Sequence, residues 1–202
     1  MLSRLDHETR DHHAAAYADL FAVLDEPTVV GYRRFLTSIY HFEYAIEARL
    51  VYVTELPIRF IATRLRSGLL ADDLVALGTD PGSLAIFARP LSHPDLPGAP
   101  EALGWIYAIQ RNTLGHAALY RALATRLREP LRRASRYLTA YANTVHQRWH
   151  ELGILLDQFV GRPELADRIV AAAGEALTRQ HQWYGSHGED SLLSVQRARA
   201  MR

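Results

Sequence analysis

The chain contains neither cysteine nor lysine. Without cysteine there is no disulfide, no thiolate chemistry and no zinc or iron–sulfur site held by cysteine. A metal ion would have to be bound by histidine, aspartate, glutamate or tyrosine, and the chain has 10 histidines. The 23 basic residues, all arginine, nearly balance 22 acidic ones. The resulting net charge of +1 gives no reason to expect a nucleic-acid partner.

Long apolar runs and strand patterns are also scarce. No apolar stretch approaches the roughly 20 residues that a membrane span needs. The polar N-terminal stretch MLSRLDHETRDHH begins a helix and does not resemble a signal peptide. We therefore expect a cytoplasmic protein without a membrane partner. At 202 residues, 49% of them hydrophobic, the chain is long enough to form one domain with a full core.

Helical periodicity dominates the sequence. Prolines and glycines separate the periodic segments, and they place the helix ends. Helices are expected over residues 4–25, 28–55, 58–66, 69–77, 101–127, 131–158 and 163–184. The helix over residues 131–158 is either continuous or interrupted around Asn143 or Gly153. Residues 185–202 are polar and rich in arginine, which is typical of a tail. The sequence thus predicts an all-α, single-domain bundle over residues 1–184 with a polar C-terminal tail over residues 185–202.

One glycine lies within an expected helix, in the stretch QRNTLGH formed by residues 110–116. Glycine inside a helix costs about 1 kcal/mol relative to alanine. Either a ligand or another backbone comes close to Gly115, or the helix tolerates one weak residue. Arg111 lies four positions earlier and therefore shares a helix face with Gly115.

His13 is the first candidate metal ligand. It is predicted to point inward, because it shares a helix face with Thr9, Ala16, Tyr17 and Leu20. The adjacent His12 is turned away by about 100°. An inward imidazole beside small residues leaves room for a flat ligand, and its Nε2 atom can bind iron. The alternative is an ordinary buried histidine that is satisfied by a hydrogen bond.

Two further sets of residues are candidates for binding. Glu43 and Glu47 lie one turn apart, and such carboxylates, joined by a histidine from another helix, can hold non-haem iron in a bundle. Glu47 can equally form an ion pair with arginines of a neighbouring helix. Arg148 and His150, on a later helix, are suited to meeting an acidic group of a ligand.

Taken in order, these stretches resemble the haem oxygenase family, whose members form biliverdin. The first helix of that family reads Leu-x-x-x-Thr-x-x-x-His, and Leu5, Thr9 and His13 have this spacing. Ala16 falls where a small residue usually follows. Residues 32–36, 38–42 and 45–47 are similar to the family's second helix, and residues 148–152 are similar to an Arg-Trp run of its bacterial members. The resemblance extends from Leu5 to about Tyr184.

The resemblance implies that haem is bound between a proximal helix and a distal helix. His13 would be the iron ligand, with Ala16 and Tyr17 beside it. Gly115 would let the distal helix approach the haem, and Asn112 would hold a distal water network. Arg148 and His150 are candidates for the haem propionates. The implied reaction opens the haem with dioxygen to biliverdin, carbon monoxide and Fe(II), and an external donor, a reductase or ferredoxin, supplies the electrons.

The distal stretch differs from the family's glycine-rich run, because Arg111 and His116 stand where glycines are usual. Two alternatives follow from this difference. In a divergent member of the fold, Arg111 and His116 fill the cavity or cap the haem iron, and the protein binds another ligand or partner. In a non-haem iron oxidase on the same fold, Glu43 or Glu47 joins inward-facing histidines around the metal.

Overall fold

The computed structural model describes the backbone of residues 1–87 and 94–200 and the side chains of residues 1–84 and 94–185. Within these residues the regular secondary structure is helical, which confirms the all-α prediction. The α-helices are α1 (Leu2–Glu8), α2 (Arg10–Phe21), α3 (Val29–Leu50), α4 (Ile58–Ala62), α5 (Ser67–Ala76), α6 (Pro81–Phe87), α7 (Ala99–Arg111), α8 (Thr113–Ala124), α9 (Arg128–Arg133), α10 (Arg136–Thr139), α11 (Val145–Asp157) and α12 (Pro163–Ala200), and a 3₁₀ turn, η1 (Ala22–Leu24), follows α2.

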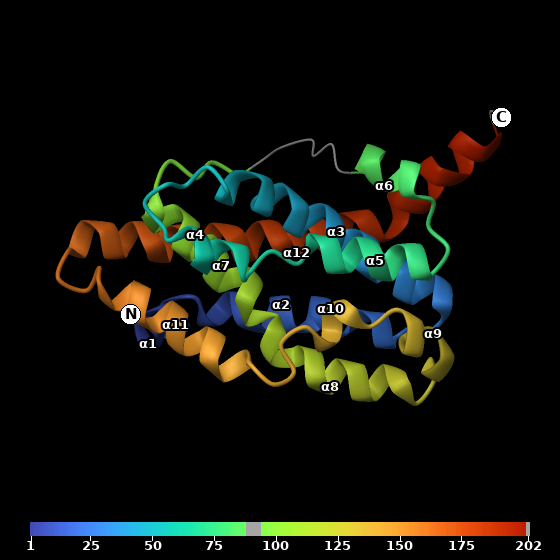
Figure 1. Cartoon of the computed structure of the whole chain (residues 1–202), viewed down its shortest axis with the longest axis horizontal. Coiled ribbons are helices and arrows are strands. Elements are labelled where there is room, and N and C mark those ends of the chain that lie inside the picture. The colour runs from blue at the N-terminus through green and yellow to red at the C-terminus, as the bar shows by residue number, and fades with distance from the viewer. Residues whose placement is uncertain (88–93, 201–202) are drawn as a thin grey trace.

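The longest helix, α12, runs through the bundle and packs along α7, α2 and α3 (Figure 1). Its contact with α7 is close at Gly104. A Cβ atom at this position would lie 2.5 Å from the Ile169 carbonyl oxygen and 2.7 Å from the Ala173 amide nitrogen. Only glycine permits two helix backbones to come this near. None of the described helices combines the length and the apolar character that a membrane span requires.

Two hydrophobic clusters form the core, and α3 contributes to both. The C-terminal half of α3 packs with α4, α7, α11 and α12 in one cluster, which includes the buried Trp105. The N-terminal half of α3 packs with α2, α5, α8, α9 and α10 in the other, which includes the buried Tyr137. Phe42 belongs to the first cluster and Ile39 to the second, so Glu43 lies near their boundary.

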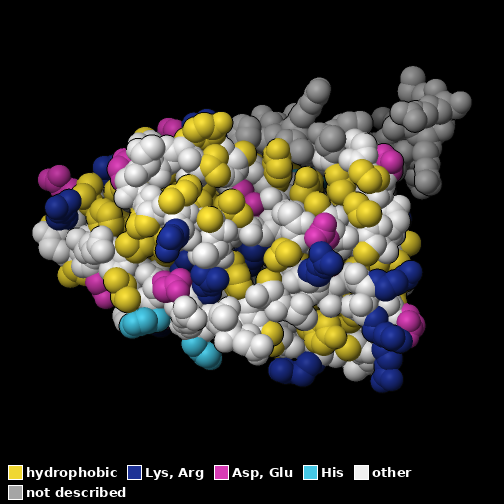
Figure 2. Space-filling view, in the orientation of Figure 1, with side chains coloured by type: hydrophobic (Ala, Val, Ile, Leu, Met, Phe, Trp, Pro, Cys, Tyr) yellow, Lys and Arg dark blue, Asp and Glu magenta, His cyan; other side chains and the backbone are white. Residues whose placement is uncertain are grey.

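Charge is distributed unevenly over the surface. Arginines gather over the end of the molecule formed by α8 and α9 (Figure 2), and the side chains of Arg121, Arg126, Arg128, Arg132 and Arg133 are exposed. Arg132 pairs with Glu129 at 3.2 Å. The net charge near zero thus averages over a basic end and other, more acidic surfaces.

Three of the expected helices are divided in the structure, and the last one is longer than expected. The first is interrupted at Thr9, whose hydroxyl donates to the Leu5 carbonyl at 2.7 Å. The helix expected over residues 101–127 becomes α7 and α8, separated at Asn112. The one expected over residues 131–158 becomes α9, α10 and α11, and α12 continues past Tyr184 to Ala200. Proline and glycine mark none of the divisions at residues 9, 112 and 134–135.

Candidate functional site

His13 lies on α2 with only 11% of its side chain exposed, as its helix face predicts. Its Nε2 atom is 2.7 Å from the Thr9 hydroxyl and 3.3 Å from the Tyr107 hydroxyl of α7. Its Nδ1 atom is 3.7 Å from an Asp6 carboxylate oxygen. Burial, together with the positive charge of Arg111, lowers the pKa of His13 to about 4. The imidazole is therefore neutral at pH 7, and its Nε2 atom has two hydroxyl partners.

Arg111 closes the space between the first helices and α7. Its Nη1 atom donates to an Asp6 carboxylate oxygen at 3.0 Å and to the Tyr107 hydroxyl at 3.4 Å. Since Tyr107 also contacts His13, the side chains of these four residues form one connected bridge. We call Asp6, His13, Tyr107 and Arg111 the proximal bridge.

Gly115 faces α2 and not an open space. A Cβ atom at this position would lie 2.6 Å from Leu20 Cδ2 and 3.3 Å from Phe21 Cε2. The glycine permits a close approach, but the neighbour is the C-terminal turn of α2. The close neighbours of Gly115 are thus side-chain atoms of α2, and not the second backbone that the sequence also allowed.

Asn112 and His116 are both buried, with 5% and 4% of their surfaces exposed. The side-chain amides of Asn112 and Gln180 donate to each other, at 3.1 and 3.3 Å. The His116 ring packs 4.7 Å from the ring of Tyr137, and burial lowers the pKa of His116 well below its ordinary value. These contacts tie α8 to α12 and α10, so both side chains have structural roles in this arrangement.

The other two candidates on α2 face in different directions. Ala16 is buried in the hydrophobic cluster that contains Trp105. Tyr17 is 57% exposed, and its ring stacks on Phe21 with centroids 4.4 Å apart. Ala16 thus contributes to the core, and Tyr17 lies at the surface.

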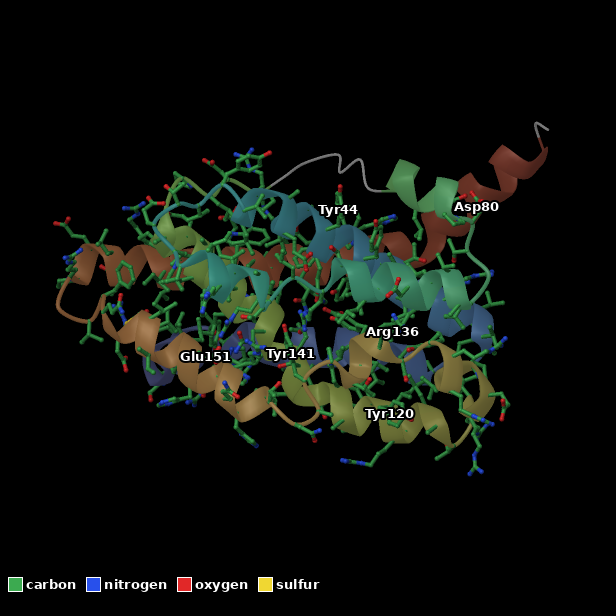
Figure 3. All side chains as sticks on the ribbon, viewed as in Figure 1. Tyr44, Asp80, Tyr120, Arg136, Tyr141 and Glu151 are labelled. Atoms are coloured by element: carbon green, nitrogen blue, oxygen red, sulfur yellow. The ribbon has the colours of Figure 1, made fainter. Side chains whose placement is uncertain are left out.

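Arg148 and His150 lie on α11, and Arg148 has contacts apart from the proximal bridge. Arg148 lies 5.5 Å over the Tyr141 ring and 3.5 Å from Glu151, and Tyr141 and Glu151 are labelled beside α11 in Figure 3. Arg64 joins this group by donating to the Arg148 carbonyl oxygen at 2.9 Å. His150 is exposed. The group links α11 to the end of α4.

Haem does not fit between α2 and the distal stretch in this arrangement. The proximal bridge crosses the space beside His13, and Leu20 and Phe21 occupy the space beside Gly115. Admitting a macrocycle would require Tyr107, which is 1% exposed, to leave the core. It would also require the Arg111–Asp6 ion pair to break.

Glu43 and Glu47 are engaged by donors of the chain itself. Arg66 Nη2 and the Tyr137 hydroxyl each donate to Glu43 Oε1 at 2.6 Å. Glu47 accepts from the backbone amides of Arg66 and Ser67 and from the Ser67 hydroxyl. The ion pair with an arginine was expected at Glu47 but forms at Glu43, because Arg66 directs its backbone amide to Glu47 and its guanidinium to Glu43. Burial raises the pKa of Glu43 to about 7, although Arg66 opposes that shift.

These carboxylates do not fit a non-haem iron centre. Their hydrogen-bond partners are arginine, tyrosine, serine and backbone amides, and a metal ligand needs its lone pairs free for the ion. In the described part of the chain no group of three or more histidine and acidic side chains is placed to hold a metal. A cavity of about 10 Å³, lined by Arg66 and Gln110 among others, lies beside this cluster. That is room for about one water molecule.

A larger concave site lies between the end of α2, the start of α3 and α12. It is a cleft of about 180 Å³ whose polar lining comes from Asp19, Glu26, Arg34, Ser38 and Tyr184. We call it the Asp19 cleft. Its volume is below the range of roughly 300–1,000 Å³ typical of sites for drug-sized ligands.

Sequence reasoning did not identify Asp6, Tyr107, Arg66 or Asp19 as site residues. Tyr107 lies four positions before Arg111, so helical spacing alone could have placed both on one face. Arg66 gave no such signal, because its carboxylate partner is 23 residues away on another helix. The chain matches no protein-family model and no curated protein.

Proposed function

We propose that this chain is a divergent haem-oxygenase-like protein that binds a ligand smaller than haem and does not open the macrocycle. The proximal bridge carries the proposal. Arg111 stands where the family usually has glycine, and its ion pair with Asp6 at 3.0 Å occupies the space beside His13. A binding role in the cytoplasm, without a membrane partner, belongs to the same proposal.

The burial of Tyr107 supports this proposal. Its hydroxyl contacts both His13 and Arg111, and its ring packs edge-on against Trp149 of α11 with centroids 5.7 Å apart. Opening the bridge would therefore also disturb the packing of α7 on α11. Leu20 and Phe21 support the proposal from the other side, because they fill the space that Gly115 leaves.

A hemin titration tests the proposal. The wild-type protein and the His13→Ala variant should give the same absorption spectra, because weak non-specific haem binding does not depend on His13. His12→Ala, a change at the neighbouring position, is the matched control. A Soret band that His13→Ala abolishes and His12→Ala preserves would contradict the proposal, and so would biliverdin formation with reductant and dioxygen.

A variant that should gain hemin binding tests the role of Arg111 directly. If Arg111 is what closes the space, Arg111→Ala should produce a Soret band on hemin addition that wild type lacks and that His13→Ala, added to the same variant, abolishes. Arg121→Ala, an exposed arginine on α8, should leave hemin binding unchanged. Equal hemin binding by the Arg111→Ala and Arg121→Ala variants would show that Arg111 does not control access of hemin to His13.

Haem binding through His13 is a second proposal, favoured by one observation. The lowered pKa of His13, about 4, keeps its imidazole neutral at pH 7, which is the form that binds metals. In this proposal Tyr107 and Arg111 move away when haem enters, and turnover would draw on an external reductase or ferredoxin. The same hemin titration separates the two proposals.

A further inference from the structure

The Asp19 cleft has a defined wall because the loop before α3 folds back onto that helix. Thr28 caps α3 by accepting a hydrogen bond from the Gly31 amide at 3.0 Å. A Cβ atom at Gly31 would overlap the Glu26 carbonyl oxygen, so glycine is needed for this approach. The fold-back places Glu26 across from Arg34, with 3.8 Å between Oε2 and Nη1. Figure 1 shows α2, the start of α3 and α12 around this region.

The cleft combines charges of both signs. Asp19 is mostly buried, with 13% of its side chain exposed, and His181 Nδ1 lies 3.0 Å from its Oδ2 atom. Burial raises the pKa of Asp19, and the hydrogen bond from His181 opposes that shift. Asp19 and Glu26 provide two carboxylates against one guanidinium, from Arg34. The lining therefore favours a ligand that carries a positive group together with an anionic one.

Two polar atoms of the lining residues are buried without a hydrogen-bond partner among the described residues. They are Nε of Arg34 and the hydroxyl oxygen of Tyr184. A buried donor left unpaired is costly, and such groups in folded proteins are usually satisfied by water or by a ligand. Both groups can donate to a carboxylate, Arg34 with its charge as well, once the side chain turns the donor from its buried position toward the cleft.

Apart from Ser38, the remaining lining is apolar or glycine. Val23, Phe35 and Ile39 form part of the wall, and Val23 and Ile39 are themselves buried. The volume of about 180 Å³ equals that of about six water molecules at roughly 30 Å³ each. A molecule with one short branched side chain is of this size.

We propose that the Asp19 cleft binds a small zwitterion of the α-amino-acid type with an aliphatic side chain. The carboxylate lies against Arg34 and Tyr184, the ammonium group lies against Asp19 and Glu26, and the aliphatic group packs on the apolar wall. The inference rests on the proposed function, since it names the class of the ligand that is smaller than haem.

Isothermal titration of the full chain at pH 7.5 tests the inference with three matched probes. L-leucine carries both charged groups, 3-methylbutylamine lacks the carboxylate, and 4-methylpentanoate lacks the amine. L-leucine should bind at least tenfold more tightly than either analogue. Equal binding of the three probes, or no binding of L-leucine at 10 mM, would overturn the inference.

Two variants test which lining residue binds the carboxylate of the ligand and which binds its ammonium group. Arg34→Gln should weaken L-leucine binding at least tenfold and leave 3-methylbutylamine unaffected. Asp19→Asn should weaken L-leucine binding at least tenfold and leave 4-methylpentanoate unaffected. Arg33→Gln and Asp25→Asn are the matched controls and should bind like wild type. Binding of L-leucine that survives both lining substitutions would place it elsewhere and overturn the inference.

Two further measurements distinguish a failure of the ligand proposal from a failure of the proposed function. Ala22→Leu adds volume to the cleft lining without removing a charge, so it should reduce L-leucine binding even if the charge variants fold poorly. The hemin titration gives a result that does not depend on the L-leucine titrations or on the cleft variants. A His13-dependent Soret band overturns the proposed function whatever L-leucine does. Absence of both the Soret band and L-leucine binding overturns only the ligand class.

Discussion

Replacing Arg66 by methionine should destabilise the fold in a pH-dependent manner. Arg66 and Glu43 are 1% and 0% exposed, and their charged groups are 2.6 Å apart. The substitution also removes the hydrogen bond from Arg66 Nη2 to the Ile109 carbonyl oxygen at 3.1 Å. The loss of these hydrogen bonds costs about 1–2 kcal/mol at any pH.

The protonation of Glu43 supplies the pH dependence. Its folded-state pKa, about 7, is above the ordinary value of 4.5, so the folded state holds this proton more tightly than the unfolded chain does. The free energy of unfolding contributed by Glu43 therefore falls as pH rises from about 4.5 to about 7. Without Arg66 this pKa should rise further, because the charge that opposes the effect of burial is gone, and the fall then continues above pH 7. Each pH unit by which it continues adds about 1.4 kcal/mol.

The expected cost of Arg66→Met is therefore about 1.5 kcal/mol at pH 5.5 and about 3 kcal/mol at pH 8. Urea unfolding followed by circular dichroism at the two pH values measures it, and adding Glu43→Gln should abolish the difference. Arg132→Met, which breaks an ion pair between side chains that are each 72% exposed, should have no measurable effect. An Arg66→Met cost that is equal at both pH values, or larger at pH 5.5, would refute this reasoning.

Three further substitutions, at Gly104, Gly174 and Asn112, test the contacts of α12. Gly104→Ala should destabilise the protein by about 2 kcal/mol, because the added carbon meets two backbone atoms of α12. Gly174→Ala, whose nearest neighbour is 4.0 Å away, should stabilise it by about 0.5–1 kcal/mol; similar melting temperatures would contradict this pair of predictions. Asn112→Ala should cost about 1–3 kcal/mol in urea unfolding, because it leaves the buried Gln180 amide unpaired. The exposed Asn143→Ala is the control, and equal midpoints for the two variants would contradict the structural role of Asn112.

The helices were largely predictable, but several of their interruptions were not. Apolar residues at helical spacing recur whether or not a helix is divided, so they located α2, α3, α7 and α12. The interruptions at Thr9 and Asn112 involve hydroxyl groups that donate to the carbonyl oxygens of preceding turns, from Thr9 to Leu5 and from Thr113 to Gln110. Such bonds compete with the helical pattern and leave no proline or glycine in the sequence.

The sequence by itself determined the helical class and the inward direction of His13, because both depend on local spacing along one helix. Only the tertiary structure decided what His13 meets, since the Tyr107 hydroxyl comes from a residue 94 positions away. It also decided the meaning of Gly115. The sequence left open whether anything comes close to that glycine, and the packing of α2 on α8 made the neighbour Leu20. A close contact between distant segments depends on how whole helices pack, and no local pattern encodes its partner.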